Sequence, residues 1–251
     1  MHRSEKIAGI SSRQLSALLN SDERFFLKKH GRSTTVGRVN GDVLGLPCNV
    51  WVKRFNNKGT IDFLLKRIFG SRAKHLWRIS KEMCKRELPV PMPIAYFEPS
   101  LEQKDSFFLS SVVEHAVSLG ELYKNGQFHD PESIAQRLGE TMAKWHMAGA
   151  VHGDMKWPNI MRQVESGSIN FYFVDLDQAK LYNKPNVQGI IKDLIRFYRY
   201  GLELGTEKWV DTLFLPAYFA ALSSELKDQI AAVDIKNKAL KAWCKKGRRR
   251  L

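Results

Sequence analysis

Residues 151–160 read VHGDMKWPNI, and shortly afterwards residues 173–177 read FVDLD. The first stretch brings Asp154, Lys156 and Asn159 close together in the chain, and the second has the pattern of an apolar strand followed by Asp175. Phosphoryl transfer from ATP needs an acid that accepts a hydroxyl proton, an amide and a second acid that bind Mg²⁺, and a cation beside the moving group. The two stretches together predict a kinase.

Each polar residue of these stretches has an expected role. Asp154 is the candidate catalytic base, and Lys156 is expected to neutralise the transferred phosphoryl group. Asn159 and Asp175 offer the hard oxygen ligands that Mg²⁺ prefers. Asp177 is expected to cap the turn. Any of these residues alone would be an ordinary surface group, but their order and the preceding strand favour a catalytic set.

The histidines near this motif have a simpler interpretation. His152 precedes the catalytic pair, and His146 lies near the end of the preceding helical pattern. A histidine at such a position is more often a buried structural residue than a proton shuttle. We expect both to be structural.

Two upstream segments are candidates for binding the nucleotide. A small, polar turn that contains Gly31, Ser33 and Thr34 is flanked by apolar alternation and predicts a hairpin over the ATP phosphates, although an ordinary hairpin turn remains an alternative. Residues 48–55 alternate like a strand, with Lys53 on the face opposite Val50 and Val52. In a kinase, a strand lysine at this place binds the α- and β-phosphates.

The order of the predicted elements gives the fold class. Residues 107–113 read as a central, nearly apolar strand that is broken at 114–116, and Val113 and Glu114 form the joint at which adenine would pair with backbone groups. We predict an α+β, two-lobed, protein-kinase-like fold. A small N-terminal lobe with an antiparallel sheet and a helix would span residues 1–114, and a larger, mostly helical C-terminal lobe would span residues 115–251.

The helical patterns fall on both sides of this joint. A short leading helix is expected within residues 1–24, an apolar stripe runs through 63–69, and a second helix follows at 72–86. In the C-terminal half, Asp130 and Pro131 start a helix that stops at Gly149. Further helices are expected at 188–204, 209–222 and 226–243, before a basic tail at 245–250.

Composition and charge limit the remaining choices. The chain has 251 residues, a net charge of +14 and three widely spaced cysteines without a Cys-x-x-Cys pair. The cysteine pattern and the lack of an apolar leader are typical of a cytosolic protein with reduced thiols. The charge favours an anionic partner. Residues 58–86 carry nine Lys or Arg against Asp62 and Glu82, so this segment either lies on an anionic membrane or has its charges in water; both interpretations stay open.

At this point a family resemblance can be stated. HGDMKWPN and FVDLD, together with LPVPMP at 88–93 and the FLxAY pattern at 214–218, resemble the bacterial lipopolysaccharide core kinases, which comprise heptose kinases and Kdo (3-deoxy-manno-octulosonic acid) kinases. The resemblance covers roughly residues 25–222. It implies ATP and Mg²⁺ as cofactors and assigns Asp154 as base, Asn159 and Asp175 as metal ligands, and Lys53 as the phosphate-binding lysine.

The resemblance also implies a substrate and a location. The acceptor would be an inner-core sugar on lipid A, an anionic molecule that accounts for the basic charge. The enzyme would act at the anionic cytoplasmic face of the inner membrane, as a peripheral protein and a monomer. No nucleic-acid partner is expected, because no nucleic-acid-binding motif is recognisable.

The sequence departs from protein kinases in several places. Leu76 occupies the expected position of the helix glutamate that pairs with the strand lysine, and Glu82 is the nearest acid. Trp51 lies where protein kinases keep a small residue over adenine. Gly153 replaces the arginine that holds a phosphorylated activation segment, and the segment between Asp175 and Asp193 is too short to dock a peptide. These last two features favour a small or lipid-linked acceptor.

Two other classes remain as alternatives. One is an enzyme of the same fold with a different acceptor, either an aminoglycoside-type kinase or a small Rio-type serine kinase. The basic charge of the chain argues against the aminoglycoside type, because aminoglycosides are cations. The other is a non-catalytic pseudokinase or binding module, which the presence of Lys53, Asp154, Asn159 and Asp175 disfavours.

Overall fold

The computed structural model describes residues 10–20 and 25–247. The fold is α+β, with a small antiparallel sheet in the N-terminal part and a larger, mostly helical C-terminal part, as predicted. The chain divides into two compact units. The N-terminal unit comprises Met1–Cys84 and Pro91–Val113, and the C-terminal unit comprises Lys85–Val90 and Glu114–Leu251.

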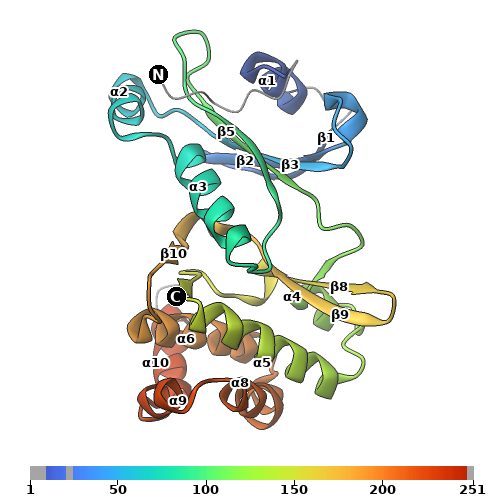
Figure 1. Cartoon of the computed structure of the whole chain (residues 1–251), viewed down its shortest axis with the longest axis vertical. Coiled ribbons are helices and arrows are strands. Elements are labelled where there is room, and N and C mark those ends of the chain that lie inside the picture. Colours follow the sequence, from blue (N-terminus) through green and yellow to red (C-terminus); the bar gives the residue numbers. More distant parts are fainter. Residues whose placement is uncertain (1–9, 21–24, 248–251) are drawn as a thin grey trace. The chain divides into compact units, whose positions relative to one another are not determined.

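The N-terminal unit is built on a five-stranded antiparallel sheet in the order β1-β2-β3-β5-β4 (Figure 1). Its elements are α1 (Ser12–Asn20), β1 (Phe25–His30), β2 (Thr34–Val39), η1 (Gly41–Leu44), β3 (Val50–Phe55), α2 (Thr60–Phe69), α3 (Arg72–Lys85), β4 (Pro93–Phe97) and β5 (Ser106–Ser111). The predicted hairpin, the predicted strand at 48–55 and the central strand at 107–113 are thus β1–β2, β3 and β5. Proline starts β4, where no ladder hydrogen bond is lost.

The two faces of this sheet pack against different helices. Val50 and Val52 are fully buried in a cluster with Leu15 and Leu19 of α1, so α1 covers their face. Arg54, also on this face, donates to Asn20 Oδ1 at 3.0 Å and ties α1 to β3. The predicted alternation of β3 is confirmed.

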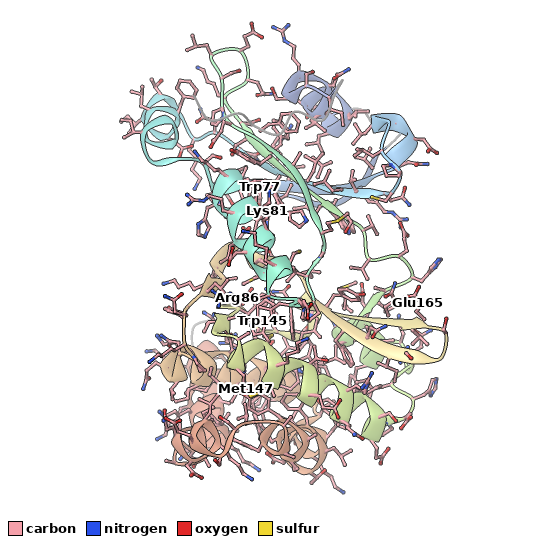
Figure 2. All side chains as sticks on the ribbon, in the orientation of Figure 1. Trp77, Lys81, Arg86, Trp145, Met147 and Glu165 are labelled. Atoms are coloured by element: carbon pink, nitrogen blue, oxygen red, sulfur yellow. The ribbon has the colours of Figure 1, made fainter. Side chains whose placement is uncertain are left out.

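Lys53 lies on the opposite face, toward α3. It pairs across the ladder with Phe108, which in turn faces Tyr96. The ring of Tyr96 is 5.1 Å from that of Trp77 in α3, and Lys81 of the same helix lies over Trp77 (Figure 2). The Lys53 face is therefore the one that α3 covers.

The C-terminal unit is mostly helical and holds two small sheets, in the orders β6-β8-β9 and β10-β7 (Figure 1). Its elements are β6 (Val117–Ser118), α4 (Leu119–Lys124), α5 (Pro131–Met147), β7 (Ala150–Val151), η2 (Trp157–Asn159), β8 (Ile160–Glu165), β9 (Ser168–Phe173), η3 (Leu176–Gln178), β10 (Lys180–Leu181), α6 (Val187–Leu204), α7 (Glu207–Trp209), the π-helix η4 (Val210–Phe214), α8 (Leu215–Ala220), α9 (Ser224–Ala231) and α10 (Ile235–Gly247). None of the described helices is long and apolar enough to cross a membrane.

The start of α5 follows the predicted chemistry. Asp130 accepts a hydrogen bond from the Ser133 N–H at 3.2 Å, and Pro131 occupies the first helical turn. Hydrogen bonds from the Ser133 side chain and from its N–H lower the pKa of the Asp130 carboxyl. The inward residues of α5 are buried, among them Trp145, whereas Met147 near its end is exposed (Figure 2).

Two elements differ from the sequence expectation. Residues 160–165 form strand β8 directly after the motif loop, where no strand was predicted. The expected helix at 226–243 is two helices, α9 and α10, because the chain breaks at 232–234 and Asp234 accepts a hydrogen bond from the Asn237 N–H at 2.8 Å to start a new turn. The basic tail is only partly described: α10 ends at Gly247, and residues 248–251 lie outside the described residues.

Candidate active site

The motif loop of residues 152–159 leaves the short strand β7 and ends in η2. Within it, Asp154, Lys156 and Asn159 come together. Lys156 Nζ lies 2.8 Å from Asp154 Oδ2, and Asn159 Nδ2 donates to the same oxygen at 3.3 Å and to the Asp154 carbonyl at 2.9 Å. The structure thus brings together three of the residues that the sequence assigned to catalysis.

These bonds leave specific atoms available to a ligand. Asp154 Oδ2 is held by Lys156 and Asn159, whereas no described donor bonds to Asp154 Oδ1. The amide of Asn159 uses its nitrogen as a donor, so its Oδ1 is free to accept or to ligate. The side chain of Asp154 is 27% exposed and that of Lys156 is 38% exposed, so both are accessible.

Trp157 anchors this loop from below. Its side chain is fully buried and its ring lies 5.6 Å from Phe197 of α6 and 5.5 Å from Trp209 of α7. Phe128 stacks on it at 6.0 Å. Because an indole buries much apolar area and adopts few orientations, these contacts fix the position of the loop that carries Lys156 and Asn159.

His152 joins the loop to the end of β9. Its Nε2 lies 2.9 Å from the Val174 carbonyl, and its Nδ1 accepts from the Asp154 N–H at 3.3 Å. A carbonyl only accepts and an amide N–H only donates, so the ring is the neutral tautomer with its proton on Nε2. Burial lowers the pKa of His152, with the charges of Asp193, Asp154 and Asp175 acting against it. The structural role predicted for His152 fits this geometry.

The same end of β9 carries Asp175. The Val174 N–H donates to the Asn159 carbonyl at 3.0 Å, so both backbone groups of Val174 bind the motif loop. Asp175 is the next residue, is exposed, and has a left-handed backbone with φ 62°. A residue other than glycine in this conformation is uncommon and is found preferentially at functional sites. Asp175 is therefore held beside Asn159 by the backbone.

Asp193 of α6 binds the start of the motif loop. This role was not predicted from the sequence. Asp193 is fully buried and accepts from the His152 N–H at 2.6 Å and from the Gly153 N–H at 2.9 Å. His146 Nε2 approaches it at 3.6 Å, longer than a hydrogen bond, while His146 Nδ1 lies 2.8 Å from the hydroxyl of Tyr218. The signal in the sequence was an acid on the apolar stripe of a helix, beside Ile190 and Leu194.

Gly153 is required by space as well as by conformation. Its φ is +77°, and a Cβ added there would lie 2.6 Å from the Gln178 carbonyl oxygen. An arginine at this position is therefore excluded by the backbone of η3. The local structure explains the glycine that replaces the arginine of regulated protein kinases.

Arg86 bonds to the segments that flank the motif loop. Its Nη1 donates to the carbonyls of Ala148 and Tyr182, both at 2.9 Å, and so joins the segment 85–90 to the end of α5 and to the chain after β10 (Figure 2). The Phe173 N–H donates to the Pro89 carbonyl at 2.8 Å and fixes the same segment to β9. The Arg86 side chain and one backbone hydrogen bond thus join the segment 85–90 to the chain on either side of the motif loop.

The expected nucleotide-binding residues lie mostly in the N-terminal unit. In the β1–β2 turn, the Gly31 N–H donates to the Thr34 carbonyl at 3.0 Å, the Ser33 carbonyl accepts from the Asn56 N–H, and Thr34 is buried. The Gly31 N–H is thus used within the turn. Lys53 lies on β3 with its Nζ 5.7 Å from the centre of the Phe55 ring.

The joint residues and the helix position near Lys53 are also placed. Val113 ends the N-terminal unit, and Glu114, whose carbonyl accepts from Gln163 Nε2 at 3.0 Å, belongs to the C-terminal unit. Leu76 is buried in α3, as expected for an apolar residue at that site, and Glu82 is half-buried nearly two helix turns further on.

The neutral state of His152 gives a pH prediction. Its pKa in the folded protein is below the unfolded value of 6.5, so the unfolded chain binds more protons under acidic conditions. The contribution of His152 to the free energy of unfolding should be fully present well above pH 6.5 and should fall below it, with an added slope of up to about 1.4 kcal/mol per pH unit. Urea unfolding across this range measures the slope. His152→Gln should remove it, and His129→Gln, which removes an exposed ring, is the control; an unchanged slope in His152→Gln would assign it elsewhere.

Comparisons with known proteins agree with this architecture. One solved structure, titled "WaaP in complex with acyl carrier protein", superimposes with a TM-score of 0.63 at 16% sequence identity and covers 91% of each chain. At this identity the likeness shows the fold. No curated protein sequence matches the chain.

The family itself is shown by a sequence model. The model of the "Lipopolysaccharide kinase (Kdo/WaaP) family" matches residues 16–218, well over half of the chain and including Lys53 and the complete motif loop. The kinase expected from the sequence is thereby confirmed, and the non-catalytic alternative is set aside. The chain belongs to the lipopolysaccharide kinase (Kdo/WaaP) family, whose members phosphorylate sugar hydroxyls of the lipopolysaccharide core.

Proposed function

We propose that this kinase uses ATP with Mg²⁺ to phosphorylate a heptose or Kdo hydroxyl of the inner core on lipid A. The observation that carries the proposal is the joining of Asp154, Lys156 and Asn159 through one carboxylate oxygen. This arrangement leaves one oxygen of Asp154 for a hydroxyl and one oxygen of Asn159 for a metal ion. Acid, amide and cation then face one reaction centre.

The donor atoms fit a magnesium nucleotide. Asn159 Oδ1 has no described donor, and the exposed carboxylate of Asp175 follows the residue that is bonded to Asn159. Amide and carboxylate oxygens with phosphate oxygens form the usual surroundings of Mg²⁺. Magnesium ATP, when bound, supplies the phosphoryl group and neutralises part of its charge. Asn159 and Asp175 would hold the metal ion.

The protein residues then have defined tasks. Asp154 Oδ1 would accept the hydrogen bond of the acceptor hydroxyl and take its proton, while Oδ2 stays bonded to Lys156 and Asn159 and fixes the orientation of the carboxylate. Lys156 would place its charge beside the transferred group, because its ammonium is already held 2.8 Å from the base. Positioning and electrostatics are the main sources of rate in this reaction.

The N-terminal unit would bind the rest of the nucleotide. Lys53 lies on the sheet face that α3 covers and is the proposed ligand of the α- and β-phosphates. The turn with Gly31, Ser33 and Thr34 would cover the phosphates. Val113 and Glu114 would offer backbone groups to adenine.

The acceptor class follows from charge and from the family. Lipid A phosphates and Kdo carboxylates are anionic, and a net charge of +14 favours such a partner. The chain between Asp175 and Asp193 is occupied by η3, β10 and the start of α6, which leaves no long segment for docking a peptide. We place the enzyme at the cytoplasmic face of the inner membrane, as a monomer.

Incubation with defined acceptors tests this proposal. Purified core glycolipids without phosphate on their core sugars, one ending in Kdo and one carrying heptose, are mixed with enzyme, ATP and Mg²⁺ and analysed by mass spectrometry. We expect one of them to gain a single phosphate in a reaction that EDTA stops. Tandem fragmentation then identifies the sugar. If neither glycolipid gains phosphate while an added aminoglycoside does, the proposed acceptor is contradicted.

A further inference from the structure

Helix α2 exposes an aliphatic face. Ile61, Leu64 and Ile68 are 76%, 52% and 72% exposed, and their spacing of three and four residues places them on one side of the helix. Of the nine large apolar side chains exposed in the described residues, these three belong to this one surface, which we name the α2 face. Single exposed aliphatic residues are ordinary, but a contiguous group indicates a contact surface.

The helix is held in place on its other side. Phe63 is 6% exposed and anchors α2 to the N-terminal unit. Gly59 and Gly70 bracket the helix with φ of +129° and +85°, backbone conformations that side chains disfavour and that let the chain turn sharply at both ends. In Figure 1, α2 lies at the outer edge of its unit, next to the start of α3. The α2 face is thus presented by a fixed element.

Basic residues flank this helix in the sequence. Exposed Lys58 lies two residues before α2 and exposed Arg72, whose guanidinium is 4.6 Å from the centre of the Phe55 ring, lies three residues after it, and exposed Arg78 follows on α3. The segment 58–86 as a whole has nine Lys or Arg and only two acids. An aliphatic patch with cations at its borders matches an anionic bilayer, in which the side chains enter the acyl boundary and the cations bind lipid phosphates.

The chemistry favours a bilayer over a protein partner. Protein interfaces are enriched in aromatic residues, methionine and arginine at their centre. Among the α2 side chains that the structure describes, the exposed apolar ones are all aliphatic.

We propose that the α2 face inserts into the interfacial layer of an anionic bilayer, with Lys58 and Arg72 at the lipid phosphates. The inference deepens the proposed function and rests on it only for the statement that the acceptor is lipid-linked. It gives the enzyme a point of attachment to the surface that carries its acceptor. Of the two interpretations that the sequence left open for residues 58–86, it selects the membrane.

Vesicle binding by the full chain is the test. Co-sedimentation is measured with vesicles of phosphatidylcholine alone and of an equal mixture of phosphatidylcholine and phosphatidylglycerol. The wild type should bind the mixed vesicles, and the triple variant Ile61→Ser, Leu64→Ser, Ile68→Ser should bind about tenfold less or weaker still, because three aliphatic side chains no longer leave water. Leu101→Ser, at a site that is 77% exposed in the same unit, is the matched control and should bind like the wild type.

Charge and insertion are then separated. Lys58→Glu should weaken binding to the mixed vesicles most at low salt, because screening already reduces its contribution at high salt. Absence of wild-type binding to the mixed vesicles, or equal binding by the triple variant, would overturn the proposal. Retention of vesicle binding by the triple variant with loss of an acidic protein partner would assign the face to that protein.

A second assay keeps this inference apart from the proposed function. Phosphorylation of a deacylated, water-soluble core acceptor should be unchanged in the triple variant, whereas phosphorylation of the glycolipid in vesicles should fall with binding. Absence of both activities in a wild-type enzyme that still binds the vesicles would count against the proposed acceptor and not against the membrane contact. Equal activity of variant and wild type on the vesicle-bound glycolipid would show that the α2 face does not serve the reaction.

Discussion

Asp154→Ala should lower the turnover number for core phosphorylation by about three orders of magnitude, near the middle of the range for removing a general base. Part of this loss should come from the neighbours of the base, because the same carboxylate also holds Lys156 at 2.8 Å and Asn159 at 3.3 Å. Without it, the cation beside the phosphoryl group and the amide at the metal both lose their anchor. Single-turnover phosphate transfer measures the chemical step directly.

Nucleotide binding separates a catalytic role from a structural one. The dissociation constant for ATP should change little in Asp154→Ala, since Asp154 contacts the acceptor and not the nucleotide in the proposed arrangement. Asp154→Asn should lose nearly as much turnover as alanine, because an amide is not a base even though its oxygen still accepts. Asp228→Ala, which removes an exposed acid of α9, is the control. Turnover within a few-fold of wild type in Asp154→Ala would remove Asp154 as the base.

Local sequence patterns were enough to predict much of the fold. Alternation predicted β3 and the side on which Lys53 lies, because a period of two residues leaves no choice of face once Val50 and Val52 are buried. The cap at Asp130 and the proline after it predicted the start of α5. These signals are local: each depends on residues within one turn or one strand.

The missed features depend on contacts that sequence does not reveal. Strand β8 begins within the motif and has a mixed burial pattern, so its residues show no alternation that would predict a strand. It is recognised only through its antiparallel pairing with β9, which begins at Ile160 and Phe173. Asp193 is separated from His152 by forty-one positions, and only the packing of α6 under the loop shows its role. The approach of Lys156 to Asp154 likewise follows from a tight loop that the buried side chain of Trp157 holds in place.

Asp193→Ala should have the second large effect, on stability as well as on rate. The change removes the acceptor of the buried His152 N–H and of the partly buried Gly153 N–H, whose bonds to Asp193 are 2.6 and 2.9 Å long. Each unsatisfied buried donor costs about 1–3 kcal/mol, so the free energy of unfolding should fall by about 2–6 kcal/mol. Urea denaturation followed by tryptophan fluorescence measures this difference. A variant that is too unstable to be purified in the folded state would correspond to the upper end of the expected loss of stability.

The kinetic consequence distinguishes Asp193 from an ordinary core residue. Because the two N–H groups precede Asp154, their release should let the base move, so the turnover number should fall at least tenfold at a temperature where the variant is folded. Tyr218→Phe is the matched control: it removes the hydroxyl that contacts His146 at 2.8 Å but leaves both bonds of Asp193, and it should cost only about 1 kcal/mol of stability with little loss of rate. Asp193→Asn keeps the volume and one acceptor oxygen, yet its amide group must face an N–H, so it should resemble alanine more than wild type. A stable Asp193→Ala enzyme with wild-type turnover would mean that the motif loop holds its geometry through Trp157 and Val174 alone.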